Sequence, residues 1–205
     1  MYELACKNRG ATDDATCITN TWQSFSGRGV KAWSEPGVFE RELYYYKTFD
    51  GDEKTSAIEL IQNPNKQGQC NAWADLFRQT LLINGVQSER IKVLPPSNYR
   101  AFGVKHIVFR SLPKGQTHST SNLDLAATGL AGQNMETPKA KLFDVHYIVK
   151  AGNTYYDPSY GIQPAGTTRV AAQTDYSSSA IGALQDPSGK WFPRGGFEIK
   201  FILAP

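Results

Sequence analysis

The chain has 205 residues, of which 40% are hydrophobic, 12% aromatic and 20% charged. This composition can bury enough apolar surface to offset the entropy lost on folding, so it excludes global disorder. The formal net charge of +3 is small and evenly spread, which argues against a nucleic-acid-binding surface. The apolar stretches fall far short of the roughly 18 residues that a membrane span needs. The length favours a single domain over residues 1–205.

Helix signals recur in the first part of the chain. An N-cap pattern around Asp13, followed by apolar residues at intervals of three or four, predicts a helix over 13–25. A shorter helix is expected over 55–62. The most regular helix begins at Cys70, ends in a C-cap at Gly85, and carries one apolar stripe. That stripe consists of Cys70, Trp73, Ala74, Phe77 and Leu81.

Strand composition predominates further along the chain. Residues 114–138 are polar and contain no aromatic side chain, which predicts a long surface insertion. The segment 161–196 is expected to be rich in loops. Together with the helices, the strands predict an α+β domain in which N-terminal helices pack on an antiparallel sheet. The expected strands are 42–48, 91–94, 101–110, 141–150, 154–157 and 197–203.

The three cysteines fall into two settings. Cys6 and Cys17 flank a polar segment whose Gly and Asp residues permit a turn, so a disulfide is one expectation and two buried thiols are the other. A bridge would indicate an oxidising compartment, by secretion or in the periplasm, and free thiols would indicate the cytoplasm. If the bridge forms, Cys70 remains as the single free thiol, in the first turn of an amphipathic helix.

Cys70 is followed by a histidine within a strand and an aspartate at the end of the next strand. A thiol nucleophile needs an imidazole to take its proton and a carboxylate to fix the imidazole tautomer, and His146 and Asp157 supply these groups in that order. The helix N-terminus adds a potential that favours the thiolate and N–H groups that can hold an oxyanion. Two of three simple hairpin registers, one with Ala151 opposite Thr154, put Asp157 and His146 on one face.

Three sequence blocks carry these residues: Gly68-Gln69-Cys70-Asn71-Ala72-Trp73-Ala74, His146 in its strand, and Tyr156-Asp157-Pro158-Ser159. In order and setting they resemble the blocks of the transglutaminase-like superfamily, over residues 55–160. The resemblance implies a papain-like α+β fold, a catalytic triad of Cys70, His146 and Asp157, and no cofactor or metal. The Cys-to-His interval is longer than in compact bacterial members, and the insertion 114–138 would explain the difference.

Other residues compete for these roles. His106 is an alternative base, and Asp144, two residues before His146, is an alternative carboxylate. His118 lies in the polar insertion and is expected to be solvated. Three histidines without spaced cysteine or carboxylate partners argue against a zinc site. Candidates for a further oxyanion donor upstream of the thiol stay unranked: Trp33, Tyr44, Tyr45, Tyr46, Gln62, Gln67 and Gln69.

These observations predict a cysteine protease or amidase, or a protein-glutamine acyltransferase, that acts on peptide or amide bonds through a thioester at Cys70. Hydrolysis is favoured over crosslinking because transfer to an amine requires a groove that excludes water. The expected partner is a protein or peptide substrate, without nucleic acid or a membrane span; the oligomeric state is not predicted. The alternatives are a non-catalytic binding or cell-surface module with the same fold, and a small-molecule acyltransferase. The chain lacks the Arg-Gly-Gly that precedes the cysteine of arylamine acetyltransferases, which counts against the latter.

Overall fold

The computed structural model is α+β within the residues that it describes, with two four-stranded antiparallel sheets and five helices. The helices are α1 (Tyr2–Cys6), α2 (Asp14–Ser26), α3 (Ala57–Gln62), α4 (Cys70–Ile83) and α5 (Arg169–Ala180). The described residues are 2–6, 8, 10–26, 31–33, 40–45, 56–62, 67–104, 108–109, 123–124 and 142–204.

The first sheet has the strand order β11 (Thr154–Tyr156), β10 (His146–Ala151), β5 (Ser88–Leu94) and β14 (Lys200–Leu203). The second has the order β13 (Trp191–Pro193), β12 (Ile181–Gln185), β6 (Ala101–Val104) and β9 (Leu142–Phe143). The remaining strands form three pairs: β1 (Lys31–Trp33) with β2 (Glu40–Glu42), β3 (Tyr44–Tyr45) with β4 (Gln67–Gly68), and β7 (Val108–Phe109) with β8 (Leu123–Asp124). The β3–β4 pair is parallel and the other two are antiparallel.

Local capping determines where α2 and α3 begin. The carboxylate of Asp13 accepts a hydrogen bond from the backbone N–H of Thr16 at 2.8 Å, which satisfies a first-turn donor of α2. At α3, Glu59 Oε2 accepts from the backbone N–H of Ser56, and Ser56 Oγ accepts from that of Glu59, a reciprocal capping box. The helices expected over 13–25 and 55–62 are therefore confirmed to within two residues.

Helix α4 has the buried stripe that its sequence predicts. All five stripe residues are buried, and Trp73, Ala74, Phe77 and Leu81 have no exposed surface. On its polar side, Asp75 Oδ2 accepts from the backbone N–H of Ala57 at 3.0 Å and from Gln79 Nε2 at 2.9 Å, which ties α4 to the start of α3.

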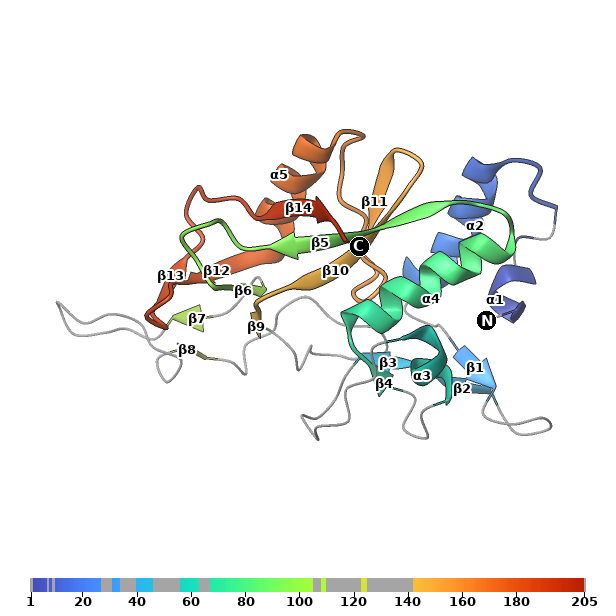
Figure 1. The fold of residues 1–205 in the computed structure, drawn as a ribbon, viewed down its shortest axis with the longest axis horizontal. Helices are drawn as coiled ribbons and strands as arrows, with labels where there is room; N and C mark the ends of the chain where they lie inside the picture. The colour runs from blue at the N-terminus through green and yellow to red at the C-terminus, as the bar shows by residue number, and fades with distance from the viewer. Residues whose placement is uncertain are drawn as a thin grey trace.

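Helices cover both faces of the first sheet (Figure 1). Tyr155 and Tyr156 are neighbours in β11, so their side chains point to opposite faces. The Tyr156 ring packs against Phe77 of α4 with centroids 5.4 Å apart. The Tyr155 ring packs 5.1 Å from Phe201 of β14, which in turn contacts Tyr176 of α5 at 5.9 Å. Helices α4 and α5 therefore lie on opposite sides of the sheet.

The segment 161–196 differs from its sequence-based prediction as loop, because it contains α5, β12 and β13. Helix α5 is rich in Ser and Ala and buries only Ala172, Tyr176, Ser177 and Ala180, so its apolar stripe is narrow. Its N-cap is Thr168, whose Oγ1 accepts from the backbone N–H of Ala171 at 3.2 Å. Of the predicted insertion 114–138, only 123–124 are among the described residues.

The structure holds Cys6 and Cys17 as free thiols, the first exposed at the end of α1 and the second buried in α2. The disulfide that was one of the two expectations is therefore not formed. Among the described helices, none combines the length and the hydrophobicity needed to cross a bilayer.

Gly68 is required for the close approach of β4 to α3 and α4. A Cβ at this position would lie 3.0 Å from Leu60 Cδ1 and 3.1 Å from Ala72 Cβ, inside ordinary contact distance. We expect Gly68→Ala to lower the free energy of unfolding by about 1–3 kcal/mol, the usual cost of overpacking. Denaturant unfolding would measure the change. Gly196→Ala is the matched control, because a Cβ there meets nothing within 4 Å; equal stabilities of the two variants would contradict the prediction.

Candidate functional site

Cys70 is the first residue of α4, separated from the β4 strand by Gln69 alone. The N-cap residue Gln69 has an extended backbone, with φ −80° and ψ 176°, and its side chain makes no capping hydrogen bond. The first backbone N–H groups of a helix have no acceptor within the helix, so those of Cys70 and Asn71 point out of the helix end. The Cys70 side chain is 7% exposed. A thiol and backbone donors thus meet at one helix end.

The β10–β11 hairpin sets the position of Asp157. Ala151 pairs with Thr154 across a two-residue turn, one of the registers that the sequence analysis considered favourable. Asp157 follows β11 and closes a short loop: its backbone N–H donates to Ile162 O at 2.7 Å, and its backbone carbonyl accepts from Ile162 N at 3.1 Å. Both ends of this loop are therefore fixed by main-chain bonds.

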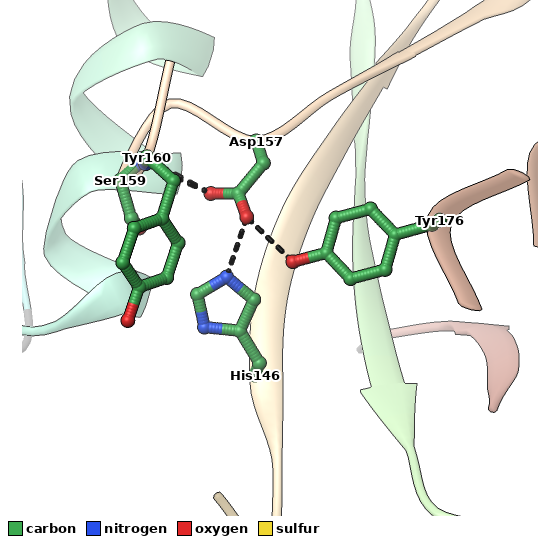
Figure 2. A network of polar contacts seen from close by, with 5 residues as sticks. All are labelled: His146, Asp157, Ser159, Tyr160 and Tyr176. Carbon is green, nitrogen blue, oxygen red and sulfur yellow. Dashed lines mark hydrogen bonds and ion pairs between the residues drawn. The ribbon is translucent and has the colours of Figure 1, made fainter. Parts of the chain in front are cut away.

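The structure brings His146 and Asp157 into contact (Figure 2). His146 Nε2 lies 2.9 Å from Asp157 Oδ2, and neither residue is exposed to solvent. The other carboxylate oxygen, Oδ1, accepts from the backbone N–H groups of Ser159 at 3.1 Å and Tyr160 at 3.3 Å. These bonds to residues two and three positions ahead form an Asx turn, which orients the carboxylate toward the histidine.

The imidazole ring of His146 is held by aromatic rings as well as by the carboxylate. Its centroid lies 4.9 Å from that of Phe143 and 5.6 Å from that of Tyr160. The second ring nitrogen, Nδ1, is buried and has no hydrogen-bond partner among the described residues. Since Nε2 is bound to Asp157, Nδ1 is the ring nitrogen left for the Cys70 side chain, whose effect on the pKa of His146 indicates that it lies close to the imidazole.

Opposing effects act on the His146 imidazole. Burial lowers its pKa, whereas Asp157, by its charge and its hydrogen bond, and the nearby Cys70 side chain raise it. The net result is a pKa raised to about 10. Asp157 and Cys70 therefore favour the protonated imidazole over the neutral one.

The structure describes some of the alternative candidates for the base, the carboxylate and the oxyanion donor, and leaves others undescribed. Asp144 is exposed, and its Oδ1 accepts from the backbone N–H of Val145 at 2.8 Å; the carboxylate on His146 is that of Asp157. His106 and His118 lie outside the described residues, as do the side chains of Trp33, Tyr44, Tyr45, Tyr46 and Gln67. Of the remaining oxyanion candidates, Gln62 is exposed and Gln69 is half-buried.

Tyr176 of α5 was not singled out in the sequence. Its hydroxyl donates to Asp157 Oδ2 at 2.6 Å, and Figure 2 shows it approaching this oxygen from the side opposite Ser159 and Tyr160. A signal was present, because Ala172, Tyr176 and Ala180 recur every four residues after the N-cap Thr168. Alanine and tyrosine make this a weak apolar stripe, which is why the helix was missed.

Within the described part of the chain, no group of three His, Cys, Asp or Glu side chains could hold a metal ion. No protein-family model, curated protein or solved structure matches the chain. A function for the chain therefore follows from the chemistry of its own residues.

Removing the Cys70 side chain should lower the pKa of His146 below its value of about 10, because the nearby sulfur is one of the groups that raise it. An NMR titration of the imidazole in Cys70→Ala would measure the shift. Asp157→Asn should lower the pKa further, since the Asp157 charge is the larger of the raising causes. Asp144→Asn, at an exposed carboxylate, should leave the titration unchanged; a wild-type value after loss of Cys70 would refute the contact.

Proposed function

We propose that the chain is a transglutaminase-like thiol enzyme that cleaves a peptide or amide bond through a thioester at Cys70. One observation carries the proposal: buried His146 is bound to Asp157 through Nε2, its other nitrogen is left without a partner among the described residues, and Cys70 is close enough to raise the pKa of the imidazole. A nucleophile, a base and an orienting carboxylate are the groups that acyl transfer by a thiol requires.

In the proposed first step, the Cys70 thiolate attacks the substrate carbonyl carbon and forms a C–S bond. The negative charge that develops on the carbonyl oxygen would be held by the backbone N–H groups of Cys70 and Asn71 at the start of α4. His146, an imidazolium at neutral pH, donates its Nδ1 proton to the leaving nitrogen as the C–N bond breaks. An amine departs, and the acyl group stays on the sulfur as a thioester.

Hydrolysis of the thioester requires His146 to act as a base. Acylation removes the negative charge of Cys70, one of the causes that raise the pKa of the imidazole, so this pKa falls when the thioester forms. His146 can then take a proton from water, whose oxygen attacks the thioester carbonyl. Collapse of this adduct releases a carboxylic acid and returns the thiolate and imidazolium pair. Asp157 stays bound to Nε2 throughout.

A papain-like core over one domain is part of the proposal. It is supported by the packing of α4, with Cys70 at its N-terminus, against β10, which begins at His146. Hydrolysis is favoured over crosslinking because the triad and backbone donors suffice for it. A protein or peptide is the proposed substrate class, and the chemistry needs no cofactor.

A non-catalytic binding module of the same fold is a second candidate. Burial favours it: His146 and Asp157 have no exposed surface and Cys70 is 7% exposed. An enzyme must admit a carbonyl carbon to the sulfur, whereas a binding module has no such requirement. Reactivity of the thiol separates the two candidates.

Cys70 should react with iodoacetamide at pH 6 much faster than a free cysteine does, because an imidazolium and a helix N-terminus stabilise its thiolate. Peptide mapping after brief alkylation would compare it with Cys6 in the same chain, which is exposed and has no such neighbours described. His146→Gln should abolish the difference. If Cys70 in the wild-type protein reacts no faster than a model thiol, the proposed mechanism fails and the binding-module candidate gains support.

Asp157→Asn should lower the rate of the catalysed reaction by a factor of order 10² to 10⁴ in a folded protein, because the amide no longer fixes the imidazole tautomer. Asp144→Asn should have little effect, since that carboxylate is exposed.

The assay would incubate the protein with a glutamine-containing protein and a labelled primary amine. Mass spectrometry would then follow peptide cleavage and deamidation. Cys70-dependent label incorporation without hydrolysis would reverse the preference for hydrolysis, and a larger loss in Asp144→Asn would overturn the carboxylate assignment.

A further inference from the structure

The carboxylate of Asp157 is shared by two side chains on the same oxygen. Oδ2 lies 2.9 Å from His146 Nε2 and accepts a hydrogen bond from the Tyr176 hydroxyl at 2.6 Å. The Tyr176 side chain is 1% exposed, so water does not compete for this bond. The tyrosine therefore acts on the carboxylate at the atom that orients the imidazole.

The hydroxyl of Tyr176 is a permanent donor. Burial first, and the adjacent charge of Asp157 second, hold the pKa of Tyr176 well above its usual value, so the proton stays on its oxygen across the neutral range. The described titratable groups that act on this network are His146, Asp157, Tyr160 and Cys70, and the pKa of Tyr160 is likewise raised well above its usual value by burial. The hydroxyls of Tyr176 and Tyr160 therefore both keep their protons in the neutral pH range in which the proposed enzyme would act.

Helix α5, which carries Tyr176, is fixed by β14 and by Ile199, the residue before that strand. Gln173 Oε1 accepts from the backbone N–H of Phe201 at 2.8 Å, and Ser177 Oγ accepts from that of Ile199 at 3.0 Å. The Tyr176 ring also packs against the Phe201 ring with centroids 5.9 Å apart. The register of α5 against β14 thus sets the position of the Tyr176 hydroxyl.

We propose that Tyr176 is a positioning residue of the active site, whose hydroxyl, set through α5 by β14, holds Asp157 in the orientation that binds His146 Nε2. This inference rests on the proposed function and extends it to the C-terminal part of the chain. Tyr176 does not touch the reacting atoms; it acts through Asp157. Without the Tyr176 hydroxyl, Asp157 Oδ2 loses a hydrogen-bond donor in a buried site. Among the described residues, His146 is then the remaining side chain that holds this oxygen.

The test is the pH profile of Cys70 alkylation by iodoacetamide in Tyr176→Phe, which keeps the ring on Phe201 and removes only the hydroxyl. The profile should move to higher pH and the rate at pH 6 should fall about tenfold, the scale of a lost hydrogen bond to a charged group. Tyr155→Phe is the matched control, because this buried ring also packs on Phe201; its profile should stay at the wild-type position. A folded Tyr176→Phe whose profile does not move, or moves to lower pH, overturns the inference.

Gln173→Ala and Ser177→Ala keep the Tyr176 hydroxyl and loosen α5 from β14. Both variants should shift the alkylation profile to higher pH by a smaller amount than Tyr176→Phe does. If Tyr176→Phe does not fold, these two variants test the inference in its place, and unshifted profiles would overturn it. If wild-type Cys70 reacts like a free cysteine, the proposed function fails separately. Nitrogen NMR of His146 then tests the role of Tyr176 independently of the proposed function. Tyr176→Phe should change the Nε2 signal, and an unchanged signal would refute the inference.

Discussion

The buried carboxylate of Asp157 is the group on which the rest of the site depends. A charge taken out of water costs several kcal/mol unless donors surround it. Here the two backbone N–H groups of Ser159 and Tyr160 bind one oxygen, and His146 and Tyr176 bind the other. This carboxylate joins a loop, a strand and a helix, and its charge is the larger of those that raise the pKa of His146.

In the proposed mechanism, the raised pKa of His146 gives the site two states with different chemistry. In the proposed reaction, a negative sulfur and Asp157 together favour the imidazole that holds both of its protons, against the effect of burial. Once the sulfur is acylated, only Asp157 remains and the balance moves toward a neutral imidazole. One side chain can thus donate a proton in the first half of a reaction and accept one in the second, without moving.

The sequence was informative wherever a local pattern decided the structure. The stripe starting at Cys70 predicted α4, and a two-residue turn at Gly152-Asn153 was among the registers that bring Asp157 near His146. It was uninformative where a contact depends on the assembled chain. Nothing local to Tyr176 marks its hydroxyl as a partner of Asp157, because that contact exists only after β14 has fixed α5. Polar helices with few large apolar residues are also the ones that periodicity detects least well.

The strand pairing has a consequence for how the protein is made. β14 pairs with β5 over Lys200–Leu203, so the first sheet joins residues from the middle of the chain to residues near its end. Contacts of such long sequence separation form late, because the intervening chain must first be ordered. During synthesis, the segment carrying Cys70 therefore emerges well before β14 can fix α5. A nascent chain would pass through a stage in which Cys70 is unsupported by the C-terminal elements, and the reactivity proposed for this thiol would arise in full only when residues 200–203 join the sheet.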